Sequence, residues 1–275
     1  MSQPINLPAT DPAPHRTQYF NNGAINNRVI TFPGPPGAPL IVFVANWRAK
    51  VKHWRAFIEV LQQKYRVRYF ETREKQATRY LTDCPDLSVE SMVDDVVSFL
   101  NELGEPYHLM GVSVGTSLIL QAWDELRQKP ESLVLLCPVL KVRMPLYFHV
   151  FPFINIKTFT RYAPLMYRLM RISPSLKSVC STLHRAMTDR DFTEIAVMKA
   201  SVQHLLRMPD PLLTGNCRPL GRTLIVRTLH DPIHTRADAD KVMNGLGAEN
   251  AFDCTDFRSV HAAQTAVRLL PFLKN

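Results

Sequence analysis

The stretch Tyr107–Trp123 has the sequence YHLMGVSVGTSLILQAW, an apolar strand, a tight turn and an apolar helix in direct succession. The turn is the segment Gly111–Gly115 (GVSVG), in which two glycines give the backbone room for a sharp bend. A Gly-x-Ser-x-Gly segment between a strand and a helix holds its serine at the tip of a strained turn. We therefore predict that Ser113 is a nucleophile at a helix N-terminus, where developing negative charge is favoured. The alternative is a structural turn with a buried serine.

Short apolar strands alternate with segments of helical spacing on both sides of this stretch. Strands are expected at 28–32, 40–45, 66–70, 107–111, 132–139, 223–229 and 250–257. Helices are expected at 53–64, 89–103, 116–126, 237–246 and 262–272. Most of the strands are apolar throughout, which is typical of strands that are buried on both faces of a parallel sheet. The predicted fold class is α/β, with a mostly parallel central sheet and helices on both of its faces.

The alternation divides the chain into three parts. Residues 1–27 are rich in Pro, Asn and Gln and show no period, so we expect a loose N-terminal arm. Residues 28–140 and 221–275 carry the strands and helices of the core. Residues 141–220 contain helical and proline-broken segments without a convincing strand, and they are predicted to form a helical cap over the sheet.

Two loops supply the groups that a serine nucleophile needs. A serine attacks effectively when a base takes its proton and a carboxylate orients that base. Asp231 follows one predicted strand and His261 follows the last one, at the edge where open α/β sheets place their sites. We interpret His234 as a surface or supporting residue, because only His261 has a strand before it to carry it to the rim. Asp253 and Asp256, in or beside the last strand, are rival candidates for the acid.

These motifs, in this order, resemble the α/β-hydrolase family. The resemblance rests on the strand, the GVSVG turn and the helix, followed by LHDPI at 229–233 and by SVH at 259–261 before the C-terminal helix. It covers about residues 28–140 and 220–275, and the segment between them falls where the family inserts a cap, after its sixth strand. The resemblance implies that Ser113, Asp231 and His261 are nucleophile, acid and base. It also implies acyl transfer to water through an acyl-enzyme, with no cofactor.

Two loops depart from the family pattern. The loop after the third strand usually begins His-Gly, but here it is Ala45-Asn46-Trp47. The family takes one oxyanion-hole N–H from this loop and the other from the residue after the nucleophile. We assign these two donors to Trp47 and Val114. The family also often has a glycine-containing turn after the next strand, whereas residues 71–76 have the sequence ETREKQ, which we interpret as a solvated, charged loop.

Composition excludes several classes of protein. The chain of 275 residues is 46% hydrophobic and 21% charged, which excludes a disordered or collagen-like chain. Its apolar runs are too short to cross a membrane, and the N-terminus lacks the pattern of a secretory signal. The five cysteines form no metal-binding pattern, so we expect reduced thiols, no metal site and a cytoplasmic location.

The positive charge is concentrated in the predicted cap. The chain has a net charge of +9, and the cap has twelve Lys or Arg residues against four Asp or Glu. Lys157, Arg161, Arg168 and Arg171 would share one face of a helix, opposite an apolar face. This face is either a solvated outer surface or a contact for an anionic acyl carrier, such as coenzyme A, or for an anionic membrane surface. Nucleic acid is disfavoured, because no binding motif is present and apolar residues interrupt the basic ones.

The sequence therefore predicts a serine hydrolase that cleaves a small-molecule carboxylic ester or thioester with a largely apolar acyl group. An acyltransferase that uses an acyl carrier is one alternative. A non-catalytic ligand-binding protein on the same fold is the other, and the atypical loop at Asn46 is the observation that suggests it.

Overall fold

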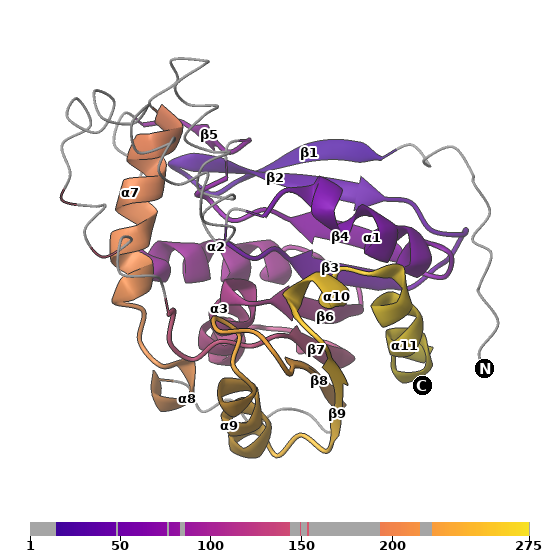
Figure 1. The fold of residues 1–275 in the computed structure, drawn as a ribbon. Coiled ribbons are helices and arrows are strands. Elements are labelled where there is room, and N and C mark those ends of the chain that lie inside the picture. Colours follow the sequence, from indigo (N-terminus) through magenta and orange to yellow (C-terminus); the bar gives the residue numbers. More distant parts are fainter. Residues whose placement is uncertain are drawn as a thin grey trace, which may run out of the picture.

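The computed structural model describes residues 15–47, 49–75, 77–82, 86–143, 149, 153, 193–214 and 222–274 (Figure 1). The strands are β1 (Arg16–Asn21), β2 (Ile25–Phe32), β3 (Leu40–Val44), β4 (Arg66–Phe70), β5 (Arg79–Tyr80), β6 (Tyr107–Val112), β7 (Ser132–Leu136), β8 (Thr223–Thr228) and β9 (Asn250–Cys254). The α-helices are α1 (Arg55–Gln62), α2 (Val89–Asn101), α3 (Val114–Ala122), α7 (Thr193–Leu206), α8 (Pro211–Thr214), α9 (Arg236–Leu246), α10 (Phe257–Val260) and α11 (Ala263–Lys274). Two 3₁₀ turns, η1 (Val51–Trp54) and η2 (Trp123–Glu125), adjoin α1 and α3.

The described strands form one mostly parallel sheet, which confirms the predicted fold class. Their order is β1-β2-β4-β3-β6-β7-β8-β9, and β5 pairs with β2. All neighbours from β4 to β9 are parallel, whereas β2 is antiparallel to β1, β4 and β5. The chain passes from β3 to β4 on one side and returns to β6 on the other. The crevice at the carboxyl ends of β3 and β6 is therefore the position where this kind of sheet forms a site.

Helices cover both faces of the sheet (Figure 1), as α1 and α11 pack on one face and α2, α3 and α9 on the other. Strand β3 shows why a continuous apolar run serves this architecture. Leu40, Val42 and Val44 pack toward α2 and α3, whereas Ile41 and Phe43 pack toward α1. Because successive side chains of a strand point to opposite faces, both sets have to be apolar.

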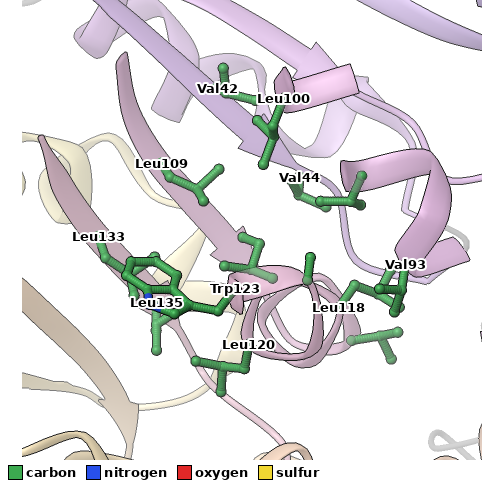
Figure 2. Packing of buried hydrophobic residues seen from close by; sticks show 14 of the residues in the cluster. Val42, Val44, Val93, Leu100, Leu109, Leu118, Leu120, Trp123, Leu133 and Leu135 are labelled. Atoms are coloured by element: carbon green, nitrogen blue, oxygen red, sulfur yellow. The ribbon is translucent and has the colours of Figure 1, made fainter. Parts of the chain in front are cut away.

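Helix α3 lies deep in the core and forms a rigid support for the turn that precedes it. Figure 2 shows Leu118 and Leu120 of this helix in one apolar cluster with the strand residues Val44 and Leu135. Leu118 is fully buried. Burying one such leucine stabilises the fold by about 1.5–3 kcal/mol, so the helix is firmly anchored.

The N-terminal region corrects the sequence prediction. A loose arm was expected over residues 1–27, but residues 16–27 belong to the β1–β2 hairpin, so that expectation is wrong for them. Gly23 has a φ of 70°, and its N–H donates to Asn21 Oδ1 at 2.9 Å. The signal was the Asn21-Asn22-Gly23 sequence, which is typical of a tight turn. Residues 1–14 lie outside the described residues.

The loop after β4 is a second correction, because residues 71–75 are buried rather than solvated. Glu71 accepts two hydrogen bonds from the Arg28 guanidinium, at 2.8 and 2.9 Å. Arg73 donates in the same bidentate manner to Asp95, at 2.7 and 2.8 Å. Charged side chains tolerate burial when they are paired and hydrogen-bonded, so these partners explain the path of the loop.

Most of the predicted cap, 141–220, lies outside the described residues, and so do Lys157, Arg161, Arg168 and Arg171. Its described part includes α7 and α8, and α7 contributes Val202 and Leu205 to the buried residues. In the described ranges, no helix combines the length and the apolar character needed to cross a membrane.

Candidate active site

Ser113 occupies the sharp turn between β6 and α3. Its φ of 51° and ψ of −118° lie in a region that residues other than glycine rarely adopt. A Cβ at Gly111 would approach the Ile119 side chain to 2.6 Å, and one at Gly115 would approach the Val44 carbonyl oxygen to 2.6 Å. Both glycines are therefore needed for the helix to close against the sheet. The predicted strand–turn–helix conformation is thus present, and strain of this kind is typical of functional sites.

His234 is the histidine that contacts this serine. Its Nε2 lies 2.9 Å from Ser113 Oγ. The ring is buried and stacks on Phe257, with the ring centroids 4.1 Å apart and the planes 11° from parallel. The Thr228 hydroxyl donates to the backbone carbonyl of His234 at 2.5 Å, which fixes the loop between β8 and α9. The imidazole is thus held against the serine hydroxyl by both its ring and its backbone.

Asp231 completes a relay with this histidine. Its Oδ1 lies 3.2 Å from His234 Nδ1 and accepts the backbone N–H groups of Ile233 and His234, each at 2.8 Å. Burial disfavours the charged carboxylate, but the hydrogen bonds and charge of His234 outweigh burial and lower the pKa of Asp231 to about 2. An ionised Asp231 keeps the proton on Nδ1, so Nε2 can accept the Ser113 proton.

His261 has a different position from the predicted one. It ends α10, and its ring packs edge-on against Trp54 and Phe257, at centroid distances of 4.1 and 4.6 Å. Its Nε2 is buried and has no hydrogen-bond partner among the described residues. The expectation that His261 would be the partner of Ser113 is therefore corrected to His234, and the interpretation of His234 as a surface residue is wrong.

The physical reason is the local path of the chain before His261. Strand β9 ends at Cys254 rather than at residue 257, and Asp256 then starts the short helix α10 by capping the N–H of Ser259 at 2.8 Å. Because of this turn, the His261 ring packs against Trp54. Burial, and then the nearby His53 and His234, lower the pKa of His261 to about 4 against a weaker opposing effect of Asp256.

Similarity to solved structures now identifies the architecture. No protein-family model and no curated protein sequence matches the chain. A putative lipase from Acinetobacter baumannii matches with a TM-score of 0.67 and 17% identity, over 95% of this chain and 92% of that one. The enol-lactonase from Burkholderia xenovorans matches with a TM-score of 0.67 and 12% identity, over 94% and 100%. A thermophilic esterase from Thermogutta terrifontis matches with a TM-score of 0.67 and 14% identity, over 94% and 98%.

The chain has the α/β-hydrolase fold. In the α/β-hydrolase sheet, Ser113 follows β6 and Asp231 follows β8, as expected from the sequence. The rival acids have other partners: Asp253 accepts from Arg227 Nε at 2.7 Å, and Asp256 caps α10.

The contact between His234 and Asp231, which the sequence prediction missed, has a sequence signal. Asp231 and His234 are separated by three positions in a loop that contains Pro232. An aspartate that begins a turn accepts backbone N–H groups two residues further along the chain, and this turn folds the following residues back over it. The Asp-Pro-Ile-His sequence thus predicts a local contact between the carboxylate and the imidazole, without any help from the last strand.

The two predicted oxyanion-hole donors lie in segments that pack together. Val114 is the first residue of α3, where backbone N–H groups have no acceptor within the helix. A Cβ at Gly115 would come within 2.9 Å of the Ala45 carbonyl oxygen, so this helix end abuts the loop that holds Trp47. The Trp47 indole N–H donates to Ser201 Oγ of α7 at 3.2 Å. The assignment of the two backbone donors stays a prediction.

No residue set in the described ranges groups three or more His, Cys, Asp or Glu side chains in a way that could hold a metal ion.

Proposed function

We propose that this protein is a serine hydrolase that cleaves a carboxylic ester or thioester through an acyl-enzyme. The observation that carries the proposal is the relay from Ser113 Oγ to His234 Nε2 at 2.9 Å and from His234 Nδ1 to Asp231 at 3.2 Å, built on a strained turn. This is the arrangement of a nucleophile, a general base and a group that orients the base.

The reaction follows from these contacts. Ser113 Oγ attacks the substrate carbonyl carbon while its proton passes to His234 Nε2, and the carbonyl π electrons move to the oxygen. Collapse of this tetrahedral species expels the alcohol or thiol, which takes the proton from His234. Water then attacks the acyl-enzyme by the same route and releases the acid. Asp231 keeps its charge throughout and stabilises the imidazolium.

The developing oxyanion would be bound by the backbone N–H groups of Val114 and Trp47. Val114 contributes a donor at the positive end of α3, which is oriented before the reaction begins. Loss of one such donor typically lowers kcat by about 10²–10³-fold, so these two peptides account for a large part of the proposed catalysis.

A second serine–histidine contact in the protein shows why the turn matters. Ser132 Oγ lies 2.8 Å from His108 Nδ1, and His108 Nε2 lies 3.6 Å from Glu131. This group sits at the amino ends of β6 and β7, on extended backbone. It lacks the strained turn and the helix N-terminus that accompany Ser113. A hydrogen-bond relay alone is therefore not sufficient evidence for a nucleophile.

The proposed substrate is a small-molecule ester or thioester. The largely apolar acyl group stays a prediction from the sequence. The lipase and the esterase of similar fold are consistent with this substrate class. An anionic acyl carrier or an anionic membrane surface at the basic face around Arg161, Arg168 and Arg171 stays a prediction, since these residues lie outside the described ranges.

A fluorophosphonate probe tests the proposal, because it forms a covalent P–O bond with an activated serine and releases fluoride. We expect wild-type protein to be labelled at Ser113 and Ser113→Ala to lose both labelling and ester hydrolysis. The matched control is Ser132→Ala, which removes the other histidine-bonded serine and should be labelled like wild type. Labelling that persists in Ser113→Ala, or an unlabelled wild-type protein, would overturn the proposal.

A further inference from the structure

The buried loop after β4 reaches the edge of the candidate active site through Lys75. Its ammonium donates to Glu74 Oε1 at 2.9 Å and to the backbone carbonyl of Asn46. The side chains of Lys75 and Glu74 are 4% and 1% exposed, so this ion pair is withdrawn from water. The Asn46 carbonyl, which accepts one of these hydrogen bonds, is a main-chain group of the loop that is expected to supply an oxyanion-hole donor.

The Asn46 carbonyl and the Trp47 N–H belong to one planar peptide unit. In a trans peptide the two groups point in opposite directions, so a group that holds the carbonyl also sets the direction of the N–H. An ammonium on the carbonyl oxygen also polarises the amide, which strengthens the N–H as a donor. Lys75 thus binds the carbonyl side of the peptide, and the proposed oxyanion would bind the N–H side.

Other contacts restrict the same peptide. The Trp47 indole is held by Ser201, and the Ala45 carbonyl lies against Gly115 at the start of α3. Asn46 occupies the position at which the resembling family usually has a glycine, and an asparagine allows the backbone less conformational freedom than a glycine does. The Asn46 carbonyl also accepts the backbone N–H of Ala49 at 3.2 Å. The buried ammonium of Lys75 therefore adds a second anchor to a carbonyl that the local turn already holds.

We propose that Lys75 is a positioning residue for the oxyanion hole, which it acts on by fixing the Asn46–Trp47 peptide. This inference rests on the proposed hydrolase function. Lys75 touches neither the substrate nor the reacting atoms, and its effect should be seen in the chemical step rather than in substrate binding.

The test compares four variants on one neutral chromogenic ester. Lys75→Met removes the charge and takes the ion pair away from the buried Glu74 carboxylate, which is destabilising. The double variant Glu74→Gln/Lys75→Met removes both charges and carries the test if the single variant does not fold. The matched control is Lys129→Met, because Lys129 also donates to a backbone carbonyl, that of Trp123, away from the site.

We expect kcat to fall by about 10–100-fold in the single and double variants, less than the loss of a whole oxyanion donor. KM should change little, the phosphonate labelling rate should fall in parallel with kcat, and Lys75→Arg should restore part of kcat. Lys129→Met should keep the wild-type kcat.

Two results would overturn the inference while the hydrolase function stands. One is a folded double variant with wild-type kcat and labelling rate. The other is a loss confined to KM or to thermal stability, without rescue by arginine, which would mean that Lys75 only holds the loop together. Absence of labelling in the wild-type protein is a separate outcome, since it removes the proposed function and this inference with it.

Discussion

The choice between the two histidines near Ser113 leads to a sharp prediction. The paired perturbations are His234→Gln and His261→Gln, which replace each ring by a side chain of similar reach that cannot act as a base. His234 Nε2 lies 2.9 Å from Ser113 Oγ. His261 is linked to the same site only indirectly, because it packs against Phe257, on which His234 stacks.

The structure sets the size of the two effects. Without His234 there is no base for the serine proton, and removal of one member of such a triad costs at least about 10⁴-fold in kcat/KM. The pKa of His261 is lowered to about 4, so this ring is neutral at pH 7 and its loss removes no charge from the site. We therefore expect His261→Gln to keep kcat/KM within about tenfold of wild type, or about 1.4 kcal/mol in barrier height.

The assay is the initial rate of hydrolysis of a short-chain p-nitrophenyl ester between pH 5 and 9, with thermal unfolding measured for each variant. His261→Gln should keep the acidic limb of the wild-type rate profile, because the base whose protonation stops the reaction is still present. His234→Gln should remain folded and almost inactive across the whole range.

The opposite ranking would refute the reasoning. If His261→Gln were inactive and His234→Gln active, His261 would be the base, and the contact of His234 with Ser113 would have no catalytic role. Comparable losses of about 10⁴-fold in both variants would mean that the two rings act as one unit through Phe257, which also contradicts a single base.

Two further predictions concern the acid Asp231 and the partly buried His261. Asp231→Asn should lower kcat by about 10³–10⁴-fold, because the amide no longer enforces the tautomer of His234. Asp253→Asn, which weakens the ion pairs with Arg227 and Arg236, should leave kcat near wild type in the same assay, and a larger loss from this variant would contradict the assignment. The free energy of unfolding should fall as the pH drops from about 6.5 to about 4, since in this range His261 takes up a proton only when the chain is unfolded. Urea titrations at pH 7 and 4.5 should show a loss of about 2–3 kcal/mol from this cause, and the loss should be absent in His261→Gln. A pH dependence that His261→Gln leaves unchanged would show that other groups cause it.

The fold and the sharp turn at Ser113 could be predicted from the sequence because local patterns determine both. A run such as Leu40–Val44 has to be buried on both faces, and the glycines around Ser113 are required by the closeness of α3 to β3. The position of Asp231 follows from the same logic, as it lies directly after a buried strand. These features depend on residues close together in the chain, and their periodicity and turn chemistry can be recognised without knowledge of distant partners.

The identity of the histidine and the fate of the charged loop were decided by tertiary structure. His234 contacts Ser113 because the β8–α9 loop folds back on Asp231, and His261 is turned away because α10 begins soon after β9 ends. The loop at Glu71–Lys75 looked solvated because its partners, such as Arg28 and Asp95, are distant in sequence. A charge can be buried only when a partner is in place, and only the folded chain brings these partners together.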